Sequence, residues 1–317
     1  MHCGADMAVN VPQTVFEALS VVVYCFVLIV IITSKQRVFK TAFYLVFVAT
    51  GCADVISIFV NGFLRIKRQL GLGPDYQHVA SFCVSTSGYT FVVHMLGNLI
   101  IAFNRYSAVC LGQHYEKIWT TRNTWIAVVF QYFISIAAIG HTIGAKMTYV
   151  HNPDGSYTFT SLEKRIDVIN RFIYFGVCLI YAIISVILNV LLMYKFHHLS
   201  RLNENVKQAH HEKRLFLYTL IVFAFSLLMC AQQIGKVFVI FSANTDFLTW
   251  ISIQFFWIND AMVSLPPYSL LMLCSHLRQD TMDFLRCKRQ RSTALPVSTS
   301  NTRIMKMKTS IVPRFVK

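Results

Sequence analysis

Four polar residues stand inside apolar stretches of this sequence, where ionisable chemistry is costly. They are Asp54, His94, Asn98 and Asp260. An ionised side chain at the centre of a bilayer costs about 2.5–3.5 kcal/mol on insertion scales, so each acid needs a partner or a function. One hypothesis is that the four form a polar cluster that holds a proton or a cation and biases a helix bundle between two arrangements. The alternative is that both acids are neutral, hydrogen-bonded and structural.

A second group of candidates surrounds an arginine at the end of an apolar segment. Asn104-Arg105-Tyr106 ends that segment, and a stretch from Tyr115 to Trp119 follows in the next loop. An arginine in this place can simply extend its guanidinium to the membrane surface. Its position also suits a switch, because a guanidinium can pair with inner groups in one state and contact a partner in another.

Two adjacent prolines lie within the last apolar segment. Pro266 and Pro267 precede Tyr268. Each proline removes a backbone hydrogen bond from a helix and favours a kink. The three residues therefore form a candidate hinge, and a static bend is the alternative.

Polar residues in one half of the apolar segments, the half expected to lie outside, are candidates for binding a ligand. Gln232, Gln233 and Lys236 fall within about one helical turn, so at least one of them faces the interior of a bundle. Lys236 either reaches the membrane surface or counters an anionic ligand, and the sequence names no ligand. The candidate ligand-binding residues are Ser87, Thr90, Tyr174, Gln232, Gln233, Lys236, Gln254 and Trp257.

The composition indicates which elements position these residues. Hydrophobic residues make up 55% of the 317 residues and charged residues 14%, and the mean hydropathy is +0.53. Soluble domains carry about 25% charged residues, so an ordinary soluble fold is excluded, as are a disordered chain and a small disulfide-stapled scaffold. An all-α membrane protein is predicted. Segments of roughly 20 apolar residues can cross a bilayer. They predict seven spans, at about 14–34, 42–64, 80–108, 124–145, 169–194, 215–241 and 249–274.

The distribution of basic residues predicts the orientation. An odd number of spans places the two termini on opposite sides, and 21 of the 29 Lys and Arg residues fall on the side of the C-terminus. The positive-inside rule then predicts an extracellular N-terminus and a cytoplasmic C-terminus. Arg65, Lys67 and Arg68, on the other side, argue mildly against this. The net charge of +15 is explained by basic loops and attraction to membrane lipid, so no nucleic acid is expected as a partner.

The end of the chain and its cysteines yield two further expectations. Apolar residues recur at helical spacing between Leu277 and Leu285, which predicts a short amphipathic helix after the seventh span. We expect residues 1–287 to form one membrane domain and residues 288–317 to form a basic, disordered cytoplasmic tail. Cys3 and Cys83 are the two cysteines expected to face an oxidising compartment, which makes a bridge between them a hypothesis.

Several classes of function lack the residues that they need. A retinal protein of the usual type requires a lysine in the last span, and residues 249–274 contain none. No histidine set at metal-binding spacing, phosphate loop or hydrolase elbow is present. We therefore expect neither an enzyme nor a cofactor or metal. A ligand-gated ion channel or a transporter subunit remains the alternative to a receptor.

The most specific stretch runs from Gly97 to Ala108 and continues at Tyr115-Glu116-Lys117-Ile118-Trp119. It resembles the third helix and second inner loop of the nematode serpentine chemosensory receptors, of class V first and class gamma next. Further similar stretches are Ala53-Asp54 and Leu265-Pro266-Pro267-Tyr268. The resemblance extends over nearly the whole chain.

This resemblance implies a rhodopsin-like seven-helix bundle in the plasma membrane. Such a receptor binds an extracellular small molecule and activates a heterotrimeric G protein through its cytoplasmic face. Arg105 would take the G-protein-facing role of the Asp-Arg-Tyr motif, together with Asn104, Tyr106, Tyr115 and Trp119. Asn104 stands where that motif has an acid, so Arg105 lacks the neighbouring carboxylate that the motif supplies.

Overall fold

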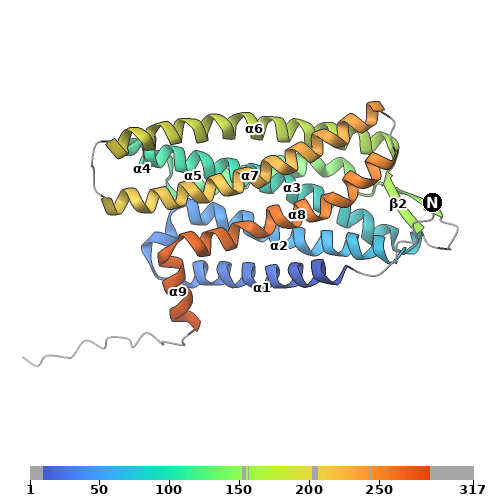
Figure 1. Cartoon of the computed structure of the whole chain (residues 1–317), viewed down its shortest axis with the longest axis horizontal. Helices are drawn as coiled ribbons and strands as arrows, with labels where there is room; N and C mark the ends of the chain where they lie inside the picture. Colours follow the sequence, from blue (N-terminus) through green and yellow to red (C-terminus); the bar gives the residue numbers. More distant parts are fainter. Residues whose placement is uncertain (1–9, 152–154, 156, 202–205, 243–244, 286–317) are drawn as a thin grey trace, which may run out of the picture.

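Long helices form the body of the molecule, as the apolar segments predict. The computed structural model describes residues 10–151, 155, 157–201, 206–242 and 245–285. The long helices lie side by side along the longest axis (Figure 1). They are α1 (Val11–Thr33), α2 (Ala42–Gln69), α3 (Gln77–Cys110), α5 (Thr121–Ile139), α6 (Lys164–Arg201), α7 (Val206–Ser242) and α8 (Thr245–Leu273). The short elements are α4 (Tyr115–Ile118), α9 (Ser275–Leu285) and the strands β1 (Met147–His151) and β2 (Tyr157–Leu162).

Six of the described helices are long and apolar enough to cross a membrane. They are α1, α2, α3, α5, α6 and α7. Helix α8, which has Asn259 and Asp260 in its middle, is not among these six, but it packs against α7, α1 and α2 within the same bundle. The prediction of an all-α, multi-pass membrane bundle is confirmed.

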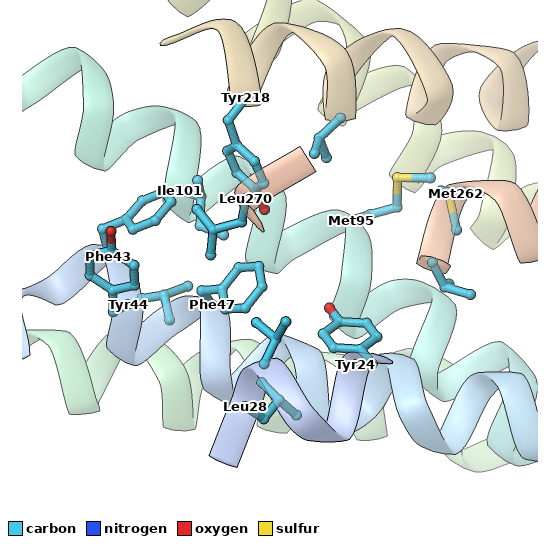
Figure 2. Packing of buried hydrophobic residues seen from close by; sticks show 14 of the residues in the cluster. Tyr24, Leu28, Phe43, Tyr44, Phe47, Met95, Ile101, Tyr218, Met262 and Leu270 are labelled. Carbon is cyan, nitrogen blue, oxygen red and sulfur yellow. The ribbon is translucent and has the colours of Figure 1, made fainter. Parts of the chain in front are cut away.

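Apolar side chains cover both the inside and the outside of this bundle. Phe43, Tyr218 and Leu270 are among the buried ones, and Figure 2 shows them meeting from α2, α7 and α8. On the outside, Phe130 and Phe133 of α5 are 62% and 67% exposed. Such a surface needs lipid rather than water as its solvent.

A glycine sets the closest approach of α3 to its neighbours. A Cβ atom on Gly97 would collide with Thr50 of α2 and with Gln131 of α5. Gln131 Nε2 donates hydrogen bonds to Thr50 Oγ1 at 3.2 Å and to the carbonyl of Val93 at 2.8 Å. The three helices are therefore joined by polar contacts that only a glycine at this position allows.

One segment differs from the helical prediction. The predicted span 124–145 is too long, because α5 ends at Ile139 and a single 3-10 turn follows. The chain then forms an antiparallel hairpin of β1 and β2, which the sequence did not predict. The amide of Tyr157 donates to the carbonyl of Gly71 at 3.0 Å, so the hairpin is fixed to the α2–α3 turn. A strand pair this short lacks a hydrophobic pattern that stands out beside membrane helices.

The two ends of the bundle are named here by what they carry. The hairpin end carries β1 and β2, and the α9 end carries α4 and α9 (Figure 1). Helix α9 is the predicted amphipathic helix. Its Leu277 is fully buried, and its Asp280 accepts a hydrogen bond from Ser34 Oγ at 2.5 Å and another from the amide of Gln36. The predicted tail 288–317 lies outside the described residues.

Candidate functional site

Arg105 is buried near the α9 end of α3. It is 5% exposed, and its guanidinium carbon lies 4.5 Å from the centre of the Phe43 ring of α2. Phe43 packs edge-on against Tyr218 of α7, with ring centres 5.7 Å apart. The cation of α3 therefore rests on rings supplied by α2 and α7, and a cation–π contact contributes about 0.5–2 kcal/mol.

Asn104 connects this arginine to the following loop. Its Oδ1 accepts a hydrogen bond from Arg105 Nη2 at 2.6 Å, and its Nδ2 donates to the Tyr115 hydroxyl at 3.2 Å. The neutral amide thus takes the place of a carboxylate, and only the donor of this hydrogen bond is charged. A hydrogen bond of this kind to a charged group contributes about 1.5–3 kcal/mol, and less where water reaches it.

Trp119 and Tyr106 are attached to the same short region. The indole Nε1 of Trp119 donates to Ser107 Oγ at 2.5 Å, and the ring of Phe103 lies between Trp119 and Tyr106, with ring centres 5.9 and 6.5 Å away. The structure therefore brings together all five residues predicted to face a partner. The sequence analysis did not single out Phe43, Phe103 or Ser107. Ser107 lies on α3 and Trp119 follows α4, so no local sequence pattern relates the two residues.

A hydrogen-bonded chain crosses the middle of the bundle. Asp54 Oδ1 lies 2.7 Å from His94 Nδ1, and Asp54 Oδ2 accepts a hydrogen bond from the Tyr24 hydroxyl at 2.7 Å. His94 Nε2 lies 2.7 Å from Asn98 Nδ2. All four side chains are at most 5% exposed. Because the Asn98 amide nitrogen can only donate, His94 Nε2 accepts from it, and His94 Nδ1 carries the proton that is donated to Asp54.

Asp260 does not join that chain, so the predicted cluster of four is wrong in this respect. Asp260 Oδ2 instead accepts a hydrogen bond from Gln13 Nε2 at 2.6 Å. Nearby, Arg65 makes two contacts with Glu17, Nε to Oε1 at 2.9 Å and Nη2 to Oε2 at 2.6 Å. Asp260 interacts electrostatically with both of these residues. The analysis missed Glu17 because a lone acid near the start of an apolar helix carries no local pattern.

The comparison with known families can now be added to this geometry. The model of the family described as "Serpentine type 7TM GPCR chemoreceptor Srv" matches residues 13–287. The chain belongs to this family. The match confirms the resemblance to class V and the prediction of a seven-helix receptor rather than an enzyme. No curated protein matches the chain.

The prolines of this Srv chemoreceptor lie inside a continuous helix. Helix α8 continues through Pro266 and Pro267 to Leu273. The hydroxyl of the next residue, Tyr268, lies 3.4 Å from Ser20 Oγ of α1. A hinge at these residues is a proposal, and the contact with Ser20 would be one of those that a movement changes.

Several of the candidate ligand residues of the chemoreceptor donate hydrogen bonds to a side chain or to the backbone. Ser87 Oγ donates to Asn61 Oδ1 at 2.7 Å, and Gln232 Nε2 donates to the carbonyl of Ile251 at 2.9 Å. Thr90 Oγ1 donates to the Ser87 carbonyl at 3.0 Å. These side chains stabilise the packing of the helices in the state described by the structure.

The remaining candidates divide between the interior and the outside. Tyr174 packs on Phe91 with ring centres 5.3 Å apart. Gln233 is buried and Gln254 half-buried. Trp257 is 43% exposed on α8 and therefore faces away from the interior. Lys236 is expected either to reach the membrane surface or to counter an anionic ligand. In the structure its Nζ lies 4.1 Å from the ring centre of Phe255.

Two basic residues that argued against the predicted orientation have partners inside the receptor. One is Arg65, bound by Glu17. The other is Lys67, which is 1% exposed and donates to the Leu72 carbonyl at 3.0 Å and to the Tyr149 hydroxyl at 3.1 Å. Burial raises the pKa of the Tyr149 phenol, so this hydroxyl stays protonated at neutral pH.

The predicted disulfide is not tested. Cys83 is 7% exposed and packs in a small apolar cluster with Leu64 and Phe256 at the hairpin end. Cys3 lies outside the described residues. The bridge therefore stays a prediction.

Proposed function

We propose that this Srv chemoreceptor lies in the plasma membrane with its hairpin end outside the cell. In this proposal it binds an extracellular small molecule and activates a heterotrimeric G protein at its α9 end. Membership of a family of chemoreceptors supports the general function. The ligand and the coupling are the parts that we infer.

The observation that carries the coupling is the way in which Arg105 is held. Its guanidinium lies inside the bundle over the ring of Phe43, and Asn104 links it by hydrogen bonds to Tyr115 in the loop. A shift of α3 relative to α2 would break the ring contact and turn the cation outward. Trp119, bonded to Ser107, would move with it. Such a change couples a helix movement to a new charged surface.

The proposed orientation rests on charge. Most of the basic residues fall on the side of the C-terminus, and Arg65 and Lys67 on the opposite side are buried against Glu17 and Tyr149. Because their charges are paired or covered, these two residues argue less strongly against the proposed orientation than basic residues in an exposed loop would. Fluorescent antibody labelling of epitopes at each terminus, before and after permeabilisation, tests this part.

The chain through Asp54, His94 and Asn98 is proposed to bias the two states of the bundle. It connects α2 and α3, and Tyr24 adds α1. A movement of α3 would lengthen the contact between Asp54 and His94, so proton position and helix position are coupled. The hinge at Pro266, Pro267 and Tyr268 is proposed to let α8 follow.

The coupling is tested by a G-protein dissociation assay in cells. Arg105→Ala is compared with wild type and with Arg122→Ala, which removes an exposed arginine at the start of α5 near the same end. Cells are screened at matched surface expression, without ligand and with pooled small odorants and water-soluble metabolites. We expect Arg105→Ala to lose dissociation and Arg122→Ala to keep it. A ligand-evoked current that persists in all three, without dissociation, would instead support the channel or transporter alternative.

A further inference from the structure

A cavity of about 640 Å³ opens between α3 and α5 at the hairpin end. It is separate from the interior residues that the sequence suggested for a ligand. Its walls are the first turns of α3 and the chain from Ile136 to Lys146. Small-molecule sites in proteins have volumes of about 300–1,000 Å³, so the cavity has the size of a ligand site.

The cavity exists because α5 ends early. After Ile139 the chain turns, and Gly144 takes a φ of 77°, a left-handed conformation that glycine adopts without strain. Helix α3 continues beside this turn, so part of its surface is not covered by α5. The turn is fixed in place because Ser85 Oγ donates to the Thr142 carbonyl at 2.9 Å and Ser81 Oγ donates to the Ala145 carbonyl at 2.8 Å. The turn that forms one wall of the cavity is therefore held against α3 by two hydrogen bonds.

The lining combines an apolar wall with a basic rim. Phe82, Ile136 and Ile143 are 68%, 55% and 75% exposed, so the mouth opens sideways toward lipid. At the rim stand His78 and Lys146, both exposed, and none of the described residues that line the cavity is acidic. The apolar part of a ligand would pack against this wall, and an anionic head group would lie near Lys146.

We propose that this cavity binds a small amphiphile with an apolar body and an anionic head group, which reaches it from the membrane. As an assignment of the receptor's ligand, this rests on the proposed function. The anionic head group places its charge near Lys146, and the apolar body packs on Phe82 and Ile136. A carboxylate of medium chain length is the simplest molecule of this class.

The position also suits transmission to the opposite end. Tyr89 lines the cavity and lies on the same helix as Arg105, about 24 Å further along at 1.5 Å per residue. Its ring lies 6.1 Å from that of Tyr132, whose hydroxyl donates to the Ala49 carbonyl of α2 at 2.6 Å. A ligand that displaces Tyr89 therefore acts on both α3 and α2, the two helices that hold Arg105.

Binding can be measured without any G protein. The full-length receptor is placed in nanodiscs of zwitterionic phospholipid and exposed to decanoic acid carrying a diazirine. After irradiation, labelled peptides are mapped by mass spectrometry, with and without excess decanoate. We expect labels within residues 77–89 or 136–146 that decanoate removes. Labelling spread evenly over the lipid-facing helices would overturn the proposal.

Two pairs of variants make this test specific. Gly140→Phe fills the cavity, since a Cβ on Gly140 meets nothing within 4 Å, and Gly176→Phe is the matched control on α6 with the same free space. Lys146→Gln removes the rim cation, and Lys164→Gln is its exposed control at the start of α6. We expect Gly140→Phe to abolish the specific label and Lys146→Gln to weaken decanoate competition about fivefold, as an exposed ion pair allows. Unchanged labelling in both variants would contradict the proposal.

A third arm separates a ligand from a membrane lipid, which shares the same chemistry. Nanodiscs that contain anionic phospholipid replace the zwitterionic ones. We expect the specific label to persist, because a cavity of about 640 Å³ has the size of a small-molecule site. Complete loss would show that the head group of a phospholipid occupies the site and would overturn the assignment to a small ligand. A failure of the G-protein assay would leave these binding results unchanged, so the two proposals fail separately.

Discussion

Asn104 and Arg105, adjacent on α3, are joined side chain to side chain at 2.6 Å. Successive residues of a helix do not face each other, so this contact requires both side chains to bend along the helix surface. Asn104 is fully buried and also bonds Tyr115. The neutral amide therefore holds the cation in the state described by the structure, in the place where a carboxylate would hold it more strongly.

Replacing that amide by an acid should make the receptor harder to activate. In Asn104→Asp, the new carboxylate faces Arg105, so a hydrogen bond whose donor alone is charged becomes an ion pair with charge on both partners. We expect basal G-protein dissociation to fall and the ligand response to shift about tenfold toward higher concentration. Dissociation is measured at matched surface expression, with Asn104→Ala expected to raise the basal signal. A higher basal signal in Asn104→Asp would refute the proposed hold on Arg105.

The ring beneath Arg105 can be tested with a matched neighbour. Phe43→Leu removes the face on which the guanidinium rests, and Phe47→Leu truncates another buried ring of the same cluster one turn away. Both variants should lose about 1 kcal/mol or somewhat more of folding free energy from reduced packing. Only Phe43→Leu should also raise basal signalling, because only it loses the cation–π contact. Thermal unfolding and basal dissociation are measured together, and equal basal signals in the two variants would oppose the prediction.

Asp54→Asn tests whether the central chain is functional or structural. The amide keeps the shape and an oxygen that can accept from Tyr24, but it replaces the carboxylate oxygen that faces His94 by an NH2 group. We expect thermal stability to change by about 1 kcal/mol or less and the basal signal to change in either direction. Tyr24→Phe is the control, because it removes one hydrogen bond and keeps the acid. If folding and signalling were both untouched in Asp54→Asn, the chain would have no role in switching.

The buried arginine of α2 should contribute far more to stability than the half-exposed one of α6. Arg65→Gln leaves Glu17 and Asp260 as two buried acids without their cation, which costs about 3–5 kcal/mol. Arg171→Gln breaks a pair with Asp167 whose side chains are 14% and 26% exposed, which costs about 0.5 kcal/mol. Unfolding of both purified variants is followed by a thiol-reactive dye. Similar losses in the two variants would show that Arg65 is not held as described.

Much of the fold follows from local composition. Apolar segments near residues 14–34 and 42–64 predict helices that the structure places at Val11–Thr33 and Ala42–Gln69. The amphipathic pattern from Leu277 to Leu285 likewise predicts α9. The free energy of transferring a segment into lipid is a sum over its own residues, so the positions of the spanning helices can be predicted from the sequence. The sequence did not predict the hairpin, because its stability depends on docking to Gly71, a contact between distant segments.

The sequence by itself determined that this chain is a seven-helix receptor with Asn104-Arg105-Tyr106 at the end of one helix. Only the tertiary structure decided which residue partners which. Asp260 bonds Gln13, 247 positions away, rather than joining Asp54, and Arg105 rests on Phe43 from another helix. Partner choice depends on how far each helix is rotated and on what its neighbours present. Those quantities arise from packing all the helices at once, and no single segment encodes them.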